Sequence, residues 1–83
     1  MTKAEILQGV EVVAHECLDR PGTLRRDMDL IDDLELDSLL LLTLAIEVEN
    51  RFQICLEQED EAAIRTVGDL VETIHRKLEA EAH

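Results

Sequence analysis

The sequence predicts an all-α fold, a small four-helix bundle of three long helices plus one short helix, with a long loop between helices one and two. Apolar residues recur at three- and four-residue spacing in three separate stretches, as on one face of a helix. Capping residues precede these stretches. The hydrophobic share of the 83 residues is 46%, almost all aliphatic, with Phe52 as the only aromatic residue. Because a chain of this length has room for one core, we expect residues 1–83 to form a single domain.

The first helix is predicted to begin after Thr2, since Thr2 and Glu5 have the spacing of a capping box. Pro21 and Gly22 are expected to end it. Cys17 falls on the apolar side and is interpreted as a small core residue. The apolar face is expected to comprise Ile6, Val10, Val13, Ala14 and Cys17.

A long acidic connection is predicted from Thr23 to Leu36. Its spacing does not fit a calcium loop, because the fifth position from Asp27 is Ile31 and the sixth is Asp32 instead of glycine. No intrinsic metal site is therefore expected. The apolar residues of the connection are expected to pack onto the bundle: Leu24, Met28, Leu30, Ile31, Leu34 and Leu36.

The second helix is predicted from Ser38 to about Phe52, with Asp37 as its N-cap. A hydroxyl on this first turn points outward, beside unpaired N–H groups and the positive end of the helix dipole. Such a place can hold a phosphate esterified to Ser38. The core face is expected to comprise Leu41, Leu44, Ala45, Val48 and Phe52, and a second apolar face, suited to a partner, Leu39, Leu42 and Ile46.

The remaining chain is predicted to contain an extended segment after Phe52, a short helical stretch from Glu57 to Ile64, and a last helix. Thr66 is the expected cap of that last helix, with Asp69 supporting its first turn. Its apolar face keeps strict helical spacing through Val67, Leu70, Val71, Ile74 and Leu78.

Charge limits the classes of partner. Twenty acidic against eight basic residues give a net charge of −12, which disfavours nucleic acid and anionic membranes and favours basic protein patches. No apolar run reaches the length of a membrane span, and no secretory signal pattern is present, so a cytoplasmic protein is expected. Cys17 and Cys55 are interpreted as free thiols, and His15, His75 and His83 as surface residues.

Along nearly its whole length the chain resembles the acyl carrier proteins. Two stretches carry the resemblance: Asp33-Leu34-Glu35-Leu36-Asp37-Ser38-Leu39 is similar to the family's segment around its modified serine, and Ile64-Arg65-Thr66-Val67-Gly68-Asp69-Leu70-Val71 resembles its entry to the last helix. The step Phe52-Gln53-Ile54 between them also has the family's spacing. Residues 1–83 are thereby identified as one acyl-carrier domain.

The resemblance implies a carrier and not an enzyme. Ser38 would be esterified by 4′-phosphopantetheine, taken from coenzyme A by a phosphopantetheinyl transferase, and Asp37 would help hold the magnesium–coenzyme A complex. The arm would carry acyl intermediates as thioesters in fatty-acid, polyketide or related lipid biosynthesis. A monomer is expected, whose acyl-transferring and acyl-modifying partners have basic or apolar docking patches. The partner-binding residues would be Leu39, Leu42, Ile46, Glu47 and Glu49.

Departures from the family pattern leave alternatives open. The family usually has glycine where Glu35 stands, so the turn before Ser38 is expected to differ. Acids common in the family are replaced by Leu40 and Thr43, which favours a dedicated pathway. The alternatives are an aminoacyl or peptidyl carrier, against which Asp37 argues, and an acidic helical interaction module that is never modified. No hydrolase motif is visible.

Overall fold

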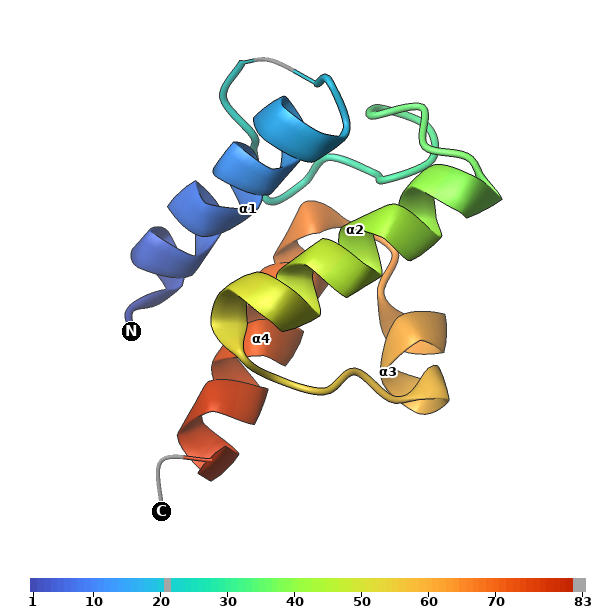
Figure 1. Cartoon of the computed structure of the whole chain (residues 1–83). Coiled ribbons are helices and arrows are strands. Elements are labelled where there is room, and N and C mark those ends of the chain that lie inside the picture. Colours follow the sequence, from blue (N-terminus) through green and yellow to red (C-terminus); the bar gives the residue numbers. More distant parts are fainter. Residues whose placement is uncertain (21, 82–83) are drawn as a thin grey trace.

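The computed structural model describes residues 1–20 and 22–81 of the chain. It has four α-helices, α1 (Lys3–Cys17), α2 (Ser38–Phe52), α3 (Gln58–Ala63) and α4 (Val67–Glu81). The three long helices pack together, and α3 lies to one side, joined by two irregular segments (Figure 1). The predicted all-α fold is confirmed, with three long helices, one short helix and a long connection between α1 and α2.

The core lies between α1, α2 and α4. The predicted faces of α1 and α4 supply many of its most deeply buried side chains, among them the fully enclosed Ile6, Val10 and Ile74. Leu78, at the outer end of the α4 face, is only partly buried. The other fully enclosed side chains are Val48, Val67, Leu70 and Val71. Packing of these aliphatic faces is the main stabilisation of helices too short to persist alone in water.

The end of α1 differs from the prediction. The helix ends at Cys17, and Pro21 lies outside the described residues. Leu18 is the C-cap and is buried, whereas Cys17 is exposed, so the assignment of Cys17 to the core is wrong. The chain turns at Asp19, whose φ is 55°. Because the turn directs Leu18 into the core, the position before it faces outward.

Gly9 allows α1 and α2 to approach closely. A Cβ at this position would lie 2.6 Å from Cζ of Phe52. Phe52 is the last residue of α2 and is buried. The missing side chain therefore makes room for the Phe52 ring and fixes where α2 ends against α1.

The connection between α1 and α2 is held to the bundle. Leu24, Leu30 and Leu36 are buried as predicted, but the assignment of Ile31 is wrong, because its side chain is 58% exposed. Backbone groups add further ties. The Val67 N–H donates to the Met28 carbonyl at 2.9 Å, and the connection pairs with the residue before α4 in an isolated antiparallel bridge between Asp29 and Thr66.

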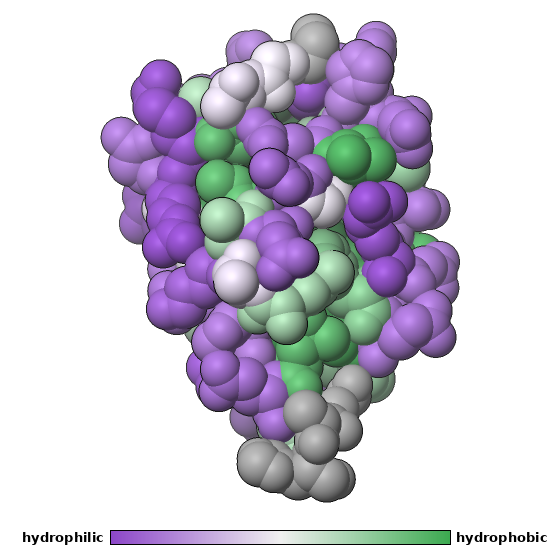
Figure 2. All heavy atoms as spheres, turned by 90° about the vertical axis from the view of Figure 1, so that its left-hand side faces the viewer, coloured by the Kyte–Doolittle hydropathy of each residue, from purple (hydrophilic) through white to green (hydrophobic). Residues whose placement is uncertain are grey.

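One face of the molecule is largely hydrophilic. Figure 2 shows the face that lies on the left in Figure 1, where hydrophilic side chains cover most of the area and an apolar strip runs down the middle. Within residues 1–20 and 22–81, no helix combines the length and apolar character needed to cross a membrane.

Candidate functional site

Ser38 is the first residue of α2 and its side chain is exposed. The preceding residue, Asp37, caps the helix as predicted: its Oδ1 accepts the Leu40 N–H at 2.9 Å, and its carbonyl accepts the Leu41 N–H at 2.8 Å. In the described part of the chain, the N–H groups of Ser38 and Leu39 have no recorded acceptor. The hydroxyl thus lies in solvent beside free N–H donors at the positive end of a 15-residue helix.

The segment before Ser38 is anchored in the bundle. Leu36 is 3% exposed, and its N–H donates to the Leu30 carbonyl at 3.1 Å. Arg20 adds a second tie, since its Nε donates to the Leu34 carbonyl at 2.8 Å. Arg20 could not be predicted from the sequence, because an arginine that donates to backbone carbonyls belongs to no motif and to no periodic pattern. These contacts fix the chain two residues before the serine.

Glu35 has the backbone conformation of a glycine. Its φ is 55°, in the left-handed region that side chains with a Cβ disfavour by about 1–2 kcal/mol. The turn that a glycine would favour is therefore retained in spite of the substitution. The substitution of Glu35 for glycine therefore adds local backbone strain before Ser38, but the chain turns as it would with a glycine.

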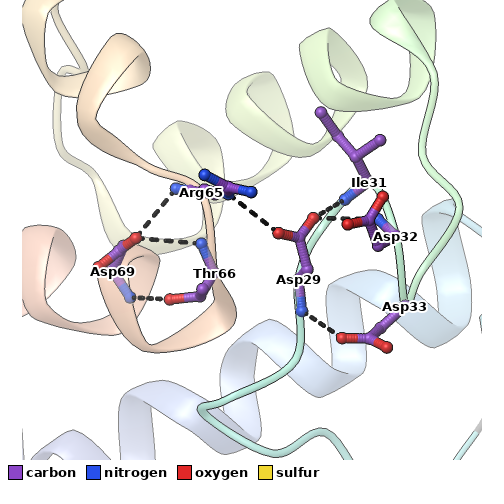
Figure 3. A network of polar contacts seen from close by, with 7 residues as sticks. All are labelled: Asp29, Ile31, Asp32, Asp33, Arg65, Thr66 and Asp69. Atoms are coloured by element: carbon purple, nitrogen blue, oxygen red, sulfur yellow. Dashed lines mark hydrogen bonds and ion pairs between the residues drawn. The ribbon is translucent and has the colours of Figure 1, made fainter.

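Asp29 organises the acidic connection. Its Oδ1 accepts the N–H groups of Ile31 and Asp32 at 2.8 and 2.9 Å, and its Oδ2 accepts Arg65 Nε at 3.2 Å. The Asp29 N–H donates in turn to the Asp33 carboxylate (Figure 3). The Asp32 and Ile31 N–H donors, more than the Arg65 guanidinium, hold the pKa of Asp29 below its ordinary value. Part of the acidic cluster before Ser38 is thus structural.

Asp69, in the first turn of α4, also accepts backbone N–H groups through its carboxylate, as Asp29 does in the connection. Its Oδ2 accepts the N–H groups of Thr66 and Arg65, both at 3.1 Å, and its own N–H donates to Thr66 Oγ1 (Figure 3). The predicted cap is confirmed as a reciprocal pair of Thr66 and Asp69. Arg65 joins the two halves, since its backbone bonds Asp69 and its side chain bonds Asp29. No group of His, Cys, Asp or Glu suited to a metal ion occurs among residues 1–20 and 22–81.

An apolar cleft of about 320 Å³ opens beside Ser38. Leu41 and Ala45 line it, which explains why these two expected core residues are only partly buried. Periodicity placed both on the inward face of the helix but did not reveal the space in front of them. The other lining residues are Leu30, Ser38, Leu42, Leu44, Leu56, Glu61, Ile64 and Leu70.

The second apolar face of α2 is exposed. Leu39, Leu42 and Ile46 are 70%, 55% and 46% exposed, respectively. The two acids of this helix, Glu47 and Glu49, are partly buried. Glu49 contacts the chain itself, since its carboxylate accepts the Leu56 N–H at 3.0 Å. The role of all five residues in partner binding stays a prediction.

The arrangement defines a class of protein, a small helical bundle that presents one serine at a helix start beside an apolar cleft. The sequence profile described as "Phosphopantetheine attachment site" matches residues 10–74. The meromycolate extension acyl carrier protein of Mycobacterium leprae is 34% identical over 82 residues, covering 98% of this chain and 70% of that protein. The acyl carrier protein of Rhodococcus erythropolis is 36% identical over 81 residues, covering 96% and 88%.

The fold is also that of a solved structure. The acyl carrier protein of Thermotoga maritima superimposes with a TM-score of 0.84 at 24% identity, covering 94% of this chain and 92% of that one. The chain belongs to the phosphopantetheine-binding acyl carrier proteins, which carry acyl intermediates of fatty-acid and related lipid biosynthesis on a covalent phosphopantetheine arm. The exposed Ser38 hydroxyl, the free N–H groups beside it and the adjoining cleft fit such a group.

Proposed function

We propose that Ser38 is the attachment residue and that residues 1–83 act as one carrier domain. The observation that carries the proposal is the position of Ser38, exposed on the first turn of α2 at the edge of the apolar cleft. A transferase can reach a hydroxyl in this position. When bound, the 4′-phosphopantetheine group supplies a terminal thiol that holds acyl cargo as a thioester.

The residues around Ser38 have distinct proposed roles. The Ser38 and Leu39 N–H groups favour the phosphodiester anion at the helix start. Asp37 bonds the Leu40 N–H through one oxygen only, so its exposed carboxylate can contact the magnesium that accompanies coenzyme A during loading. Leu41 and Ala45 offer an apolar wall to the first part of a bound acyl chain.

The partner surface is proposed to be the exposed face of Leu39, Leu42 and Ile46, with Glu47 and Glu49 at its border. Thr43 is a neutral side chain on this face, and its hydroxyl donates to the Leu39 carbonyl. The transferase and the acyl-transferring and acyl-modifying enzymes would dock here through apolar or basic patches. The neutral character of this face supports a dedicated pathway.

Acyl cargo is proposed over aminoacyl or peptidyl cargo. The names of the relatives support this choice, since two of them are called acyl carrier proteins, one of these in meromycolate extension. The cargo and the reacting thiol would belong to the arm and the catalysis to partner enzymes, so the chain itself is proposed not to be an enzyme. Trapping the thioester cargo in the native host separates the two cargo classes, since an amino acid on the arm would contradict the proposal.

A cytoplasmic monomer is the proposed state. The exposed thiols Cys17 and Cys55 suit a reducing compartment. The net charge of −12 makes two copies repel each other, which supports the monomer. Sedimentation at low and physiological salt would reveal a dimer if this proposal were wrong.

Incubation with coenzyme A, magnesium and a broad-specificity transferase, followed by intact mass measurement, tests the attachment. We expect one phosphopantetheine per chain in the wild type and none in Ser38→Ala. Asp37→Asn is a matched variant, because asparagine also caps helices but lacks the charge. It should keep its stability and load more slowly. An unchanged mass of the wild-type protein would instead support an interaction module that is never modified.

A further inference from the structure

The position of helix α3 depends on the contacts of a single carboxylate. It is six residues long, and none of its residues is buried. A helix of this length is unstable in water without tertiary contacts. Leu56 and Ile64 anchor the segments on either side of it. The contacts that hold the helix itself must therefore come from polar groups.

Asp60 supplies those contacts. Its side chain is 12% exposed, and its Oδ1 accepts Arg76 Nη2 at 3.0 Å. Its Oδ2 accepts Lys77 Nζ at 2.8 Å and the Glu57 N–H at 3.0 Å. One carboxylate thus joins the first turn of α3 to two successive cations of α4. The Lys77 contact is also the main reason that the pKa of Asp60 lies below its ordinary value.

The position of α3 affects the cleft beside Ser38. Glu61 of α3 and the flanking residues Leu56 and Ile64 line one part of it, and most of the other lining residues come from α2. In Figure 1, α3 lies beside the bundle between two irregular segments. Because none of its own residues is buried, a displacement of α3 would remove no buried side chain of this helix from the core. A displacement of α3 away from α4 would change the room in the cleft.

We propose that Asp60, through Arg76 and Lys77, is the latch that holds α3 in place and thereby sets the length of acyl chain that the cleft accepts. Asp60 is a positioning residue and touches no cargo. The part concerning cargo rests on the proposed attachment of the arm at Ser38, whereas the latch itself does not. Release of the latch frees α3 and enlarges the cleft, and the long helices stay folded.

Hydrogen exchange of the unloaded protein tests the latch. In Asp60→Asn, the amides of Glu61 and Ile64, which donate to the Glu57 and Glu61 carbonyls, should exchange about tenfold faster, while those of α1 and α2 keep their rates. Lys77→Gln should act in the same direction, and the double variant should differ little from Asp60→Asn. Glu59→Gln is the matched control, because Glu59 is an exposed acid of the same helix, and it should have no effect. Unchanged exchange in α3, or equal acceleration in all helices, would overturn the latch.

The effect on cargo is measured on protein loaded at Ser38 with saturated straight-chain acyl arms of increasing length. The rate of thioester cleavage by hydroxylamine reports how well the cleft shelters each chain. In the wild type we expect one length at which cleavage is slowest, and in Asp60→Asn that optimum should move to longer chains. An unmoved optimum would overturn the role in cargo length. Failure to load Ser38 would contradict the proposed function and leave the exchange test intact.

Discussion

Arg20 Nε donates a hydrogen bond to the Leu34 carbonyl at 2.8 Å, and Arg20 Nη1 donates to the Leu18 carbonyl at 3.1 Å. One guanidinium thus joins the end of α1 to the segment that leads into Ser38. Its side chain is partly buried. The two carbonyls would lose a charged donor in a site with limited access to water if Arg20 were replaced.

Arg20→Lys should lower the free energy of unfolding by about 1–3 kcal/mol, because a single ammonium cannot reproduce the geometry of the guanidinium. Denaturant titration measures this change. Hydrogen exchange should also accelerate at the Leu36 amide, which bonds Leu30 in the same segment. Arg25→Lys is the control, since Arg25 forms an exposed pair with Asp27 worth well under about 1 kcal/mol. Equal losses in the two variants would contradict a special role of Arg20.

Glu35→Gly should stabilise the protein. The φ of 55° at Glu35 is one that glycine adopts without strain, and relief of the strain should exceed the added entropy of the unfolded chain by up to about 1 kcal/mol. Thermal unfolding measures the gain as a higher Tm. Gln8→Gly is the control, because Gln8 is exposed within α1 and its replacement should cost about 1 kcal/mol. A loss of stability in both variants would mean that Glu35 makes contacts that compensate for its strain.

Asp69→Asn should remove a contribution to stability that depends on pH. The N–H groups of Thr66 and Arg65 hold the pKa of Asp69 below its ordinary value of 3.8 in the folded protein. The unfolded chain therefore binds the proton more readily, so the carboxylate stabilises the fold above this value and loses its effect as the pH falls through the folded pKa. The difference between wild type and variant should be present at neutral pH and shrink below about pH 3.8. A difference that is independent of pH would contradict the assignment.

Leu42 and Leu44 form a matched pair on one helix. Leu42 is 55% exposed and Leu44 is buried. Leu44→Ala should cost about 2–5 kcal/mol of folding free energy, whereas Leu42→Ala should cost less than about 1 kcal/mol. Leu42→Glu should slow loading by the transferase and turnover by acyl-transferring partners while the Tm stays close to that of the wild type. A drop in Tm that parallels the loss of turnover would place Leu42 in the core.

The periodic parts of the fold could be predicted from the sequence. Thr2, Asp37 and Thr66 cap the helices that follow them, and the buried faces of α1 and α4 follow their spacing. Helical periodicity and capping are local properties, so sequence spacing records them directly. Cys17 shows the limit of this reasoning. The spacing predicts that Cys17 is buried, but the helix ends at this residue and Leu18 is buried in its place.

The contacts that hold the site together could not be predicted in the same way. Arg20 meets Leu34, and Arg65 meets Asp29 36 positions away, only because the connection folds back onto the bundle. The cleft beside Ser38 likewise depends on where α3 lies. Such contacts join segments distant in the sequence and have no fixed spacing. The resemblance to a family indicated Ser38 itself, but not the residues that place it.

The most direct test of the central claim is the chemical state of Ser38 in the protein purified from its native host. Fragmentation mass spectrometry of the peptide that contains Asp37 and Ser38 locates any modification to a single side chain. We predict phosphopantetheine on Ser38, with an acyl thioester on a fraction of the molecules. An unmodified Ser38 in a host whose other carrier proteins bear the group would contradict the account.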